Sequence, residues 1–211
     1  EQVNGIQDNI TKTYQNAIDT RGYLTDEEYA YINDQFAKLR EITQIEMSNS
    51  KTELEVLQKD INNGRLDLSE EGYNELIKKI QEKEKEANNE AWDIRISAYN
   101  DAEKQKLINE RAGMSAEKVA KIYAEQLKIA DEDYKKTVSE NTAIVEKMYD
   151  SIQTQIENKK KEVASGGTWV KTIFGSAVKE YNTEEKTMMG LYDKMLKNIQ
   201  THKDNITKEA K

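Results

Sequence analysis

The chain has 211 residues, of which 34% are charged and 36% are hydrophobic. That composition leaves too little apolar side chain for one thick globular core, but enough for narrow seams along helices. The net charge of −8 disfavours nucleic acid as the main partner, and the absence of Cys excludes a disulfide framework, a thiol nucleophile and a Cys-ligated zinc.

Helix formation is favoured along almost the whole chain. Proline, which removes an amide donor and breaks helices, is absent, and only nine residues are Gly. Glu, Lys, Ala, Gln and Leu, which lose little side-chain freedom in a helix, dominate the long stretches. No apolar run reaches the roughly 20 residues of a membrane span, and none near Glu1 is typical of a signal sequence. Because the chain has no initiating Met, we expect it to be an excised piece of a longer protein.

Three short segments interrupt the helical pattern, near residues 22–25, 64–69 and 113–115. In each, a glycine able to adopt the left-handed conformation ends one helix, and a Thr or Ser follows whose hydroxyl can accept an amide of the next helix. The predicted N-caps are Thr25, Ser69 and Ser115, and only Thr25 also has the Glu, Glu28, that completes a capping box. Apolar residues flank each cap as a hydrophobic staple: Leu24 with Tyr29, Leu68 with Tyr73, and Met114 with Val119.

The predicted helices run from the N-terminus to 21, from 25 to 62, from 69 to 112 and from 115 to 164. The caps lie 44 and 46 residues apart, which indicates either a degenerate internal repeat or the similar caps that any set of helical hairpins needs. At about 1.5 Å per residue the longer helices reach roughly 55–75 Å, which is typical of coiled coils. We therefore predict an all-α fold of long helices with coiled-coil or helical-hairpin packing, elongated in shape.

Apolar stripes at steps of three and four residues indicate the seams between these helices. In helix 25–62 the stripe drifts round the helix through Ile32, Phe36, Leu39, Ile42 and Ile45. Helix 69–112 carries a narrow stripe that permits close approach of a partner, formed by Ala87, Ala91, Ile94 and Ala98. Tyr residues lie largely on the stripes, and we expect them to pack there rather than form a ligand surface.

The stripe of helix 115–164 slips by one residue. It first runs through Ala120, Tyr123, Leu127, Ala130, Tyr134 and Thr137, and resumes out of phase with Val145, Tyr149, Ile152 and Ile156. Such a slip predicts either locally altered supercoiling or a change of partner helix.

Residues 165–182 differ from the rest. A flexible Gly-rich junction at Gly166 and Gly167 precedes a segment that we predict to be a short amphipathic helix, either folded back onto the long helices or presented as a partner-contact face. The residues of that face are Trp169, Val170, Ile173, Phe174 and Val178, on the same side as Ala177 and Tyr181. A last helix is expected from Thr183 to about 207. The chain thus divides into a long-helix coiled-coil region, 1–164, and shorter C-terminal helices, 165–211.

No catalytic or metal-binding motif is evident. The one histidine, His202, lies in a polar stretch, and a Glu-x-x-His motif fails there because Ile199 stands three residues before it. Gly-rich phosphate cradles are missing. Carboxylates occur at spacings that suit solvation and Glu–Lys pairing on helix surfaces. We therefore expect no enzyme, no cofactor and no metal.

Two stretches of this chain resemble the coiled-coil parts of tail tape measure proteins of long-tailed phages and prophages of Gram-positive bacteria. The first is residues 91–103, AWDIRISAYNDAE. The second is the break at 113–117, GMSAE, that leads into residues 125–134, EQLKIADEDY. The turn at 166–169, GGTW, with Gly175 after it, is also similar to that family. The likeness spans about residues 25–180.

The resemblance implies a structural component of a phage or prophage tail: a helical rod segment of a tape-measure-like protein that sets tail length or fills the tail. It implies manufacture in the bacterial host cytoplasm, a place in the virion tail, and protein partners, namely further copies of itself, tail-tube proteins and chaperones. We do not expect membrane contact by this segment. The alternative is the helical targeting or adhesion region of a secreted bacterial toxin or surface protein. The sequence leaves open whether each break reverses the chain or merely interrupts a rod.

Overall fold

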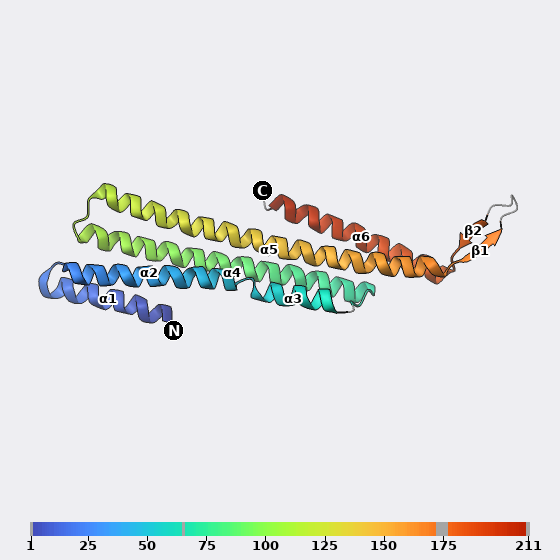
Figure 1. Cartoon of the computed structure of the whole chain (residues 1–211), viewed down its shortest axis with the longest axis horizontal. Coiled ribbons are helices and arrows are strands. Elements are labelled where there is room, and N and C mark those ends of the chain that lie inside the picture. Colours follow the sequence, from blue (N-terminus) through green and yellow to red (C-terminus); the bar gives the residue numbers. More distant parts are fainter. Residues whose placement is uncertain (1, 65, 172–176, 210–211) are drawn as a thin grey trace. The chain divides into compact units, whose positions relative to one another are not determined.

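The computed structural model describes residues 2–64, 66–171 and 177–209 (Figure 1). The predicted all-α class with packed long helices is confirmed, with one short β-hairpin added near the C-terminal end. Within the described residues, no helix is long and apolar enough to cross a membrane. The elements are α1 (Gln2–Arg21), α2 (Asp26–Asn49), α3 (Thr52–Asn63), α4 (Glu70–Arg111), α5 (Ala116–Gly166), β1 (Thr168–Lys171), β2 (Ala177–Glu180) and α6 (Thr183–Glu209).

The helices form two compact units. The long helices α4 and α5 each belong to both, with one part in the first unit and the other part in the second. The first unit contains residues 1–51 and 86–138, and the second contains residues 52–85 and 139–211. This division does not follow the boundary expected at residue 164, because each unit is assembled from segments that are distant in the sequence. The first unit holds α1, α2 and the adjoining halves of α4 and α5, while the second holds α3, α6, the hairpin and the other halves.

The core of the first unit joins α1, α2 and α4. Part of the stripe predicted for helix 25–62 is confirmed, but Ile42 is only half-buried and Ile45 is 60% exposed. Drift of the stripe round the helix explains this, since its C-terminal members turn away from the partner helices. The buried core residues are Ile6, Ile10, Ile32, Phe36, Leu39 and Ile108.

In the first-unit halves of α4 and α5, the predicted stripes are partly confirmed. Ala87, Ala91, Ala130 and Thr137 are buried, whereas Ala120 is exposed. Small side chains at Ala91 and Ala130 permit close approach of neighbouring helices.

The second unit has its own core, built mainly from the C-terminal half of the α5 stripe. The four residues predicted after the phase slip, Val145, Tyr149, Ile152 and Ile156, are all at most 1% exposed. The expected last helix is confirmed as α6. Its buried residues are Tyr192, Met195 and Ile199.

The phase slip in α5 coincides with a change of partner helix. Before it, the Gln44 amide of α2 donates to Asp133 at 3.2 Å. After it, the Gln155 amide donates to the Ile61 carbonyl of α3 at 3.0 Å. The boundary between the units falls after residue 138, between the two stripes. Of the two explanations predicted for the slip, the change of partner is therefore the one observed.

The break before α2 and the break before α5 have the predicted glycine and cap chemistry. Gly22 and Gly113 adopt φ of 80° and 78°, which is the left-handed region that favours glycine. Thr25 and Glu28 form the predicted capping box, in which the Glu28 amide donates to Thr25 Oγ1 and the Thr25 amide donates to the Glu28 carboxylate. Ser115 accepts a longer bond, 3.4 Å, from the Lys118 amide.

The break before α4 differs from the prediction at its glycine. Ser69 caps α4 as expected, accepting the Gly72 amide at 3.1 Å. Gly64, however, is not left-handed. Its amide donates to the Asp60 carbonyl at 2.8 Å and so continues the hydrogen bonding of α3 for one more residue.

A further break was not predicted, and the single helix expected over 25–62 is wrong. The helix is interrupted at residues 50–51, between α2 and α3. Ser50 is buried, its amide donates to the Glu46 carbonyl, and its hydroxyl donates to the Met47 carbonyl at 2.8 Å. A Ser hydroxyl that bonds a preceding carbonyl can bend or end a helix without any Gly or Pro. The interruption coincides with the boundary between the units.

Each of the three predicted breaks reverses the chain. The α1–α2 pair forms the blue hairpin of Figure 1. Across the break before α4, Lys83 Nζ lies 2.5 Å from the Glu53 carboxylate of α3. Across the break before α5, Arg95 Nη2 lies 2.6 Å from Asp131. Both pairs join residues on opposite sides of a break, so the breaks form helical hairpins rather than interruptions of a rod.

The short helix predicted within 165–182 is wrong. The chain forms β1 and β2 there, paired antiparallel with Thr168 opposite Glu180. The β-branched and aromatic residues of Thr168–Lys171 favour extended backbone. The helical period read from this segment did not outweigh that preference. Gly167 allows a close approach, because a Cβ there would lie 2.6 Å from the Tyr181 ring.

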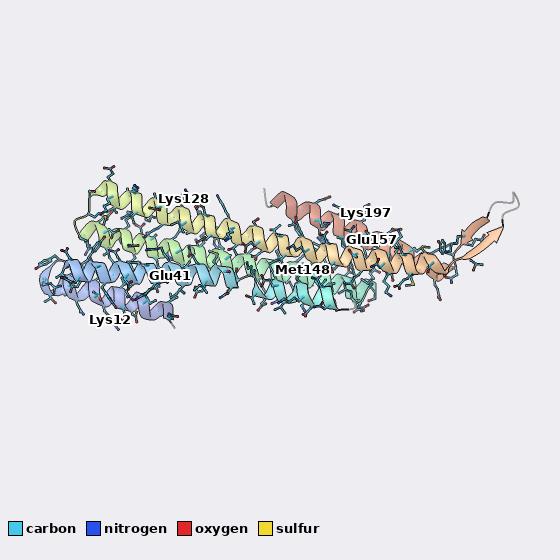
Figure 2. All side chains as sticks on the ribbon, in the orientation of Figure 1. Lys12, Glu41, Lys128, Met148, Glu157 and Lys197 are labelled. Atoms are coloured by element: carbon cyan, nitrogen blue, oxygen red, sulfur yellow. The ribbon has the colours of Figure 1, made fainter. Side chains whose placement is uncertain are left out.

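Charged side chains occupy the outer surfaces of the helices. Figure 2 labels Lys12, Glu41 and Lys128, which are exposed on α1, α2 and α5, and Met148, which is fully buried in the second unit. This division between a charged surface and apolar seams is typical of amphipathic helices that pack side by side.

Candidate functional site

The contact face predicted from the sequence falls on the hairpin rather than on a helix. Trp169 and Val170 belong to β1 and Val178 to β2, with Val170 opposite Val178 in the register. Ile173 and Phe174 lie outside the described residues, as do the side chains of the other three. The structure therefore does not describe these five side chains as one surface, and their role stays a prediction.

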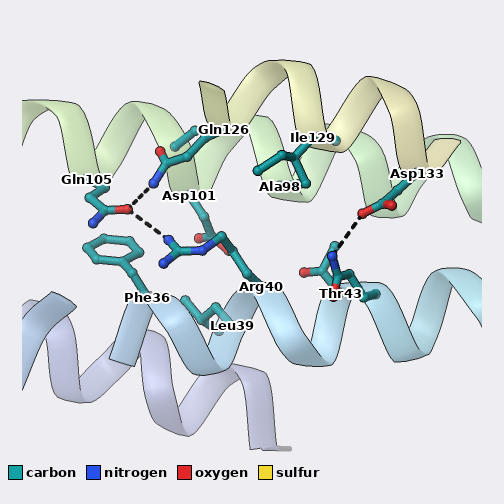
Figure 3. Close-up of a pocket in the computed structure, with 13 residues that line it drawn as sticks. Phe36, Leu39, Arg40, Thr43, Ala98, Asp101, Gln105, Gln126, Ile129 and Asp133 are labelled. Carbon is teal, nitrogen blue, oxygen red and sulfur yellow. Dashed lines mark hydrogen bonds between the residues drawn. The ribbon is translucent and has the colours of Figure 1, made fainter. Parts of the chain in front are cut away.

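A buried polar arrangement lies inside the first unit, around Gln105 of α4. This side chain is only 5% exposed. Its amide donates to Asn33 Oδ1 at 2.7 Å, and its carbonyl oxygen accepts from Arg40 at 3.2 Å and from the Gln126 amide (Figure 3). Three helices, α2, α4 and α5, are thus joined through one buried amide. We call these four residues the Gln105 cluster.

A second buried amide lies one helical turn further along α4. Asn109 is 1% exposed and accepts a 2.8 Å hydrogen bond from the Tyr29 hydroxyl of α2. Buried polar groups are costly unless they are paired, so such contacts favour one alignment of α2 against α4 over neighbouring ones. The two amides therefore act together to specify the register of these helices.

A small cavity adjoins the Gln105 cluster. Figure 3 shows it between α2, α4 and α5, with Phe36, Leu39 and Ile129 on its apolar side and Asp101 on its polar side. The space open to water is about 40 Å³, far below the roughly 300 Å³ of the smallest ordinary ligand pockets. A few water molecules are what this volume can hold.

The polar groups around the cavity fit water. Gln126 Oε1 is buried and has no hydrogen-bond partner among the described residues. Burial raises the pKa of Asp101, although the Gln7 amide donates to this carboxylate at 3.0 Å. A water molecule bonded to Gln126 Oε1 would satisfy the orphaned acceptor. The cavity is therefore too small for an ordinary metabolite and has room for only a few water molecules.

A second cluster joins α4 to α5 around Arg95. The guanidinium carbon lies 4.8 Å from the ring centre of Trp92, 4.9 Å from that of Tyr99 and 5.3 Å from that of Tyr134. Arg95 Nε donates to Asp131 at 2.7 Å, and the Tyr99 hydroxyl donates to the same oxygen at 2.5 Å. We call these five residues the Arg95 cluster.

Hydrogen bonding and charge pairing favour the ionised forms of Arg95 and Asp131. The Tyr99 hydroxyl and Arg95 lower the pKa of Asp131, and the hydrogen bond to Asp131 raises the pKa of Tyr99. Desolvation lowers the pKa of Arg95, but its hydrogen bonds to Asp131 and Tyr99 outweigh this, so the pKa of Arg95 is raised overall. A carboxylate with a lowered pKa is a poor proton acceptor near neutral pH. The arrangement therefore suits a clamp between two helices and not acid–base chemistry.

His202 has a packing role in the second unit. Its ring stacks on Tyr149, with ring centres 5.7 Å apart and planes 7° apart, and its Nδ1 lies 3.3 Å from the Gln81 amide. Burial lowers the pKa of His202, and burial raises the pKa of Tyr149 strongly. Tyr73, whose pKa burial raises to about 12, donates to the Met195 carbonyl at 3.2 Å. These contacts hold α6 against α4 and α5.

Within the part of the chain that the structure describes, no group of three or more His, Asp or Glu side chains is placed to hold a metal ion. The Gln105 cluster could not be predicted from the sequence, because buried Gln and Asn follow no spacing that separates them from surface residues. The Arg95 cluster could be predicted in part, since Tyr134 belongs to the predicted stripe of helix 115–164 and Tyr99 follows Ala98, the last member of the stripe of helix 69–112.

Comparison with known proteins identifies no relative. No protein-family model matches the chain, no curated protein matches it, and no solved structure matches its fold.

Proposed function

We propose that this chain is a helical structural segment of a phage or prophage tail protein of the tape measure kind. The observation that carries the proposal is the pair of long helices α4 and α5, of 42 and 51 residues. They are held to each other and to their neighbours by narrow buried seams and by the Gln105 and Arg95 clusters. Such construction gives stiffness and defined register to a polar chain, which is what a tail component needs.

The residues behind the family resemblance are the ones that form the helix pair. Residues 91–103 supply Trp92, Arg95 and Tyr99, and residues 125–134 supply Asp131 and Tyr134. Trp92 and Tyr134 meet edge to face, with ring centres 5.7 Å apart and planes 74° apart. The two stretches that resemble tape measure proteins therefore pack against each other, which supports a structural role like that of the family.

The proposed partners are proteins: further copies of this chain, tail-tube proteins and assembly chaperones. The proposed location is the virion tail, after synthesis in the host cytoplasm. The three breaks that reverse the chain also shorten the segment. A continuous helix adds about 1.5 Å of length per residue, whereas antiparallel helices cover the same length twice. We therefore propose a packed helical segment within the tail protein in place of an extended rod.

Mass spectrometry of fractionated particles tests this proposal. Phage particles are induced from the source strain, purified on a density gradient and separated into heads and tails. Peptides of this chain are expected in the tail fraction at constant ratio to tube protein. Recovery in the particle-free medium or the cell envelope, with none in tails, would contradict the proposal and favour the secreted toxin or surface-protein alternative.

An in-frame deletion gives a second test. Removing the α1–α2 hairpin, residues 2–49, from the parent gene should shorten tails or block their assembly, as seen by electron microscopy. A matched control replaces the exposed Lys12 and Glu41 by Gln, which alters surface charge without removing a helix. Tails of normal length and number after the deletion would count against a structural role in the tail.

A further inference from the structure

We propose that the first unit binds the first unit of a second copy of this chain through two different surfaces. An acidic ridge on α2 of one copy lies in a basic groove between α1 and α4 of the other copy. The docked α2 runs antiparallel to the α4 that it contacts. The groove is lined by Tyr14 and Gln15 of α1 and by Lys104, Leu107, Ile108 and Arg111 of α4. It offers about 350 Å³ to water-sized molecules. The inference concerns the purified chain and does not depend on a place in a phage tail.

The groove combines an apolar floor with positive charge. Leu107 is 51% exposed, which is unusual for Leu at the centre of a helix pair. Lys104 and Arg111 stand one turn to either side of it. The charge of Lys104 also acts on Asp101, one turn before it on α4, while Lys104 itself stays exposed. Arg111 lies over the Tyr14 ring at 5.9 Å. A partner for this groove needs an apolar side chain flanked by two carboxylates.

The outer face of α2 has that chemistry. Glu27, Tyr31 and Asp34 are all exposed, and Tyr31 is 42% exposed. Asp34 pairs with Lys38 of its own helix at 2.7 Å and accepts from the Gln35 amide at 3.2 Å, but its side chain remains 58% exposed. These three residues, the α2 ridge, present one aromatic side chain between two acids.

The spacings of ridge and groove match in one orientation. From Glu27 the ridge steps four residues to Tyr31 and three to Asp34, while the groove steps three from Lys104 to Leu107 and four to Arg111. Antiparallel docking therefore places Glu27 by Arg111, Tyr31 by Leu107 and Asp34 by Lys104. Residues three and four apart lie on one helix face, so all three contacts form together.

Ridge and groove lie on different faces of the unit. The inner faces of α2 and α4 meet through the Tyr29–Asn109 and Asn33–Gln105 hydrogen bonds, so their outer faces point away from each other. One copy can therefore use its ridge and its groove at once. Contacts between two different surfaces generate open chains unless a ring closes. Association should accordingly continue beyond the dimer.

Sedimentation velocity of the full chain over a dilution series tests the proposal. The average mass should rise with concentration at low salt and fall when about 1 M salt screens the charges. The groove variant Lys104→Glu with Arg111→Glu, and the ridge variant Glu27→Lys with Asp34→Lys, should each lower the association constant by about tenfold or more. An equimolar mixture of the two variants should restore association, because each reversed surface meets its complement.

The control variant is Lys121→Glu with Lys128→Glu on α5. It makes the same charge change at the same spacing on exposed residues outside the groove, and should associate like the parent chain. Circular dichroism verifies that every variant keeps its helix content. The proposal is overturned by a chain that stays monomeric throughout, which would leave an acidic helix of another protein as the occupant to seek. It is equally overturned by variants whose mixture fails to associate.

Discussion

Single buried polar side chains decide how the helices of the first unit align. An apolar seam of Ala, Ile and Leu tolerates sliding by a turn, since one apolar contact replaces another at little cost. Gln105 and Asn109 do not tolerate it, because a shift would separate them from Asn33 and Tyr29 and leave buried groups unpaired. Register is therefore specified by a few residues. Their paired hydrogen bonds add little net stability, but breaking one is costly because its partners stay buried.

Removing the hub of this network should be costly. Gln105→Ala leaves the Asn33 acceptor, Arg40 and the Gln126 amide without their shared partner, and should lower the free energy of unfolding by about 1–3 kcal/mol. Urea denaturation followed by circular dichroism measures this. The control Gln200→Ala removes an exposed bond to Asp204 on α6 and should change stability by less than about 0.5 kcal/mol. Equal effects would show that burial of Gln105 carries no special weight.

His202 should make the second unit sensitive to mild acid. Because burial lowers its folded-state pKa below the ordinary 6.5, the unfolded chain takes up a proton before the folded chain does. The contribution is complete above about pH 6.5 and is lost as pH falls towards the folded pKa. The His202→Phe variant keeps a ring stacked on Tyr149 but cannot titrate. Its free energy of unfolding should fall less than that of the parent between about pH 7 and 5.5. Identical slopes would contradict the assignment.

Helices and helix ends could be predicted wherever apolar spacing or capping residues mark them in the sequence. The stripe from Val145 to Ile156 and the caps at Thr25 and Ser115 could be predicted because spacing and capping residues are written in the sequence. The break at Ser50 could not, since a buried Ser among polar residues reads like helix surface. The hairpin was missed because its residues also fit a helical period. For the same reason the predicted contact face was placed on a helix, whereas its described residues lie on the two strands. The Gln105 cluster depends on partners from three helices, which no local pattern reveals.

Glycines in different elements should respond oppositely to the same substitution. Gly113 has φ of 78°, so Gly113→Ala forces an L-residue into the left-handed region and should cost about 1 kcal/mol. Gly190 lies inside α6 with open space where a Cβ would stand. Gly190→Ala should therefore stabilise the chain by about 0.5–1 kcal/mol. Thermal unfolding of both variants measures the difference. Stabilisation by Gly113→Ala would refute the helix-end geometry, and destabilisation by Gly190→Ala would refute the open space in α6.

At the scale of the whole molecule, two separate cores share two continuous helices. The interruption at residues 50–51 and the phase slip in α5 both fall where one unit ends and the other begins. Each unit therefore has its own seams, and α4 and α5 carry the chain from one set of partners to the other. A single defect should loosen the unit that contains it before it affects the other.

Hydrogen exchange measured by mass spectrometry can separate the two units. Ala91 and Ile199 are both fully buried, Ala91 in the first unit and Ile199 in the second. Ala91→Asp places a charge in a buried seam and should speed exchange in α1 and α2 by far more than in α3 and α6, while Ile199→Asp should do the reverse. Ala120→Asp, at an exposed position of the first unit, should leave all four helices protected. If either buried charge loosened all four helices alike, the two cores would have to unfold as one cooperative structure, because only then can the shared helices transmit the whole loss of stability.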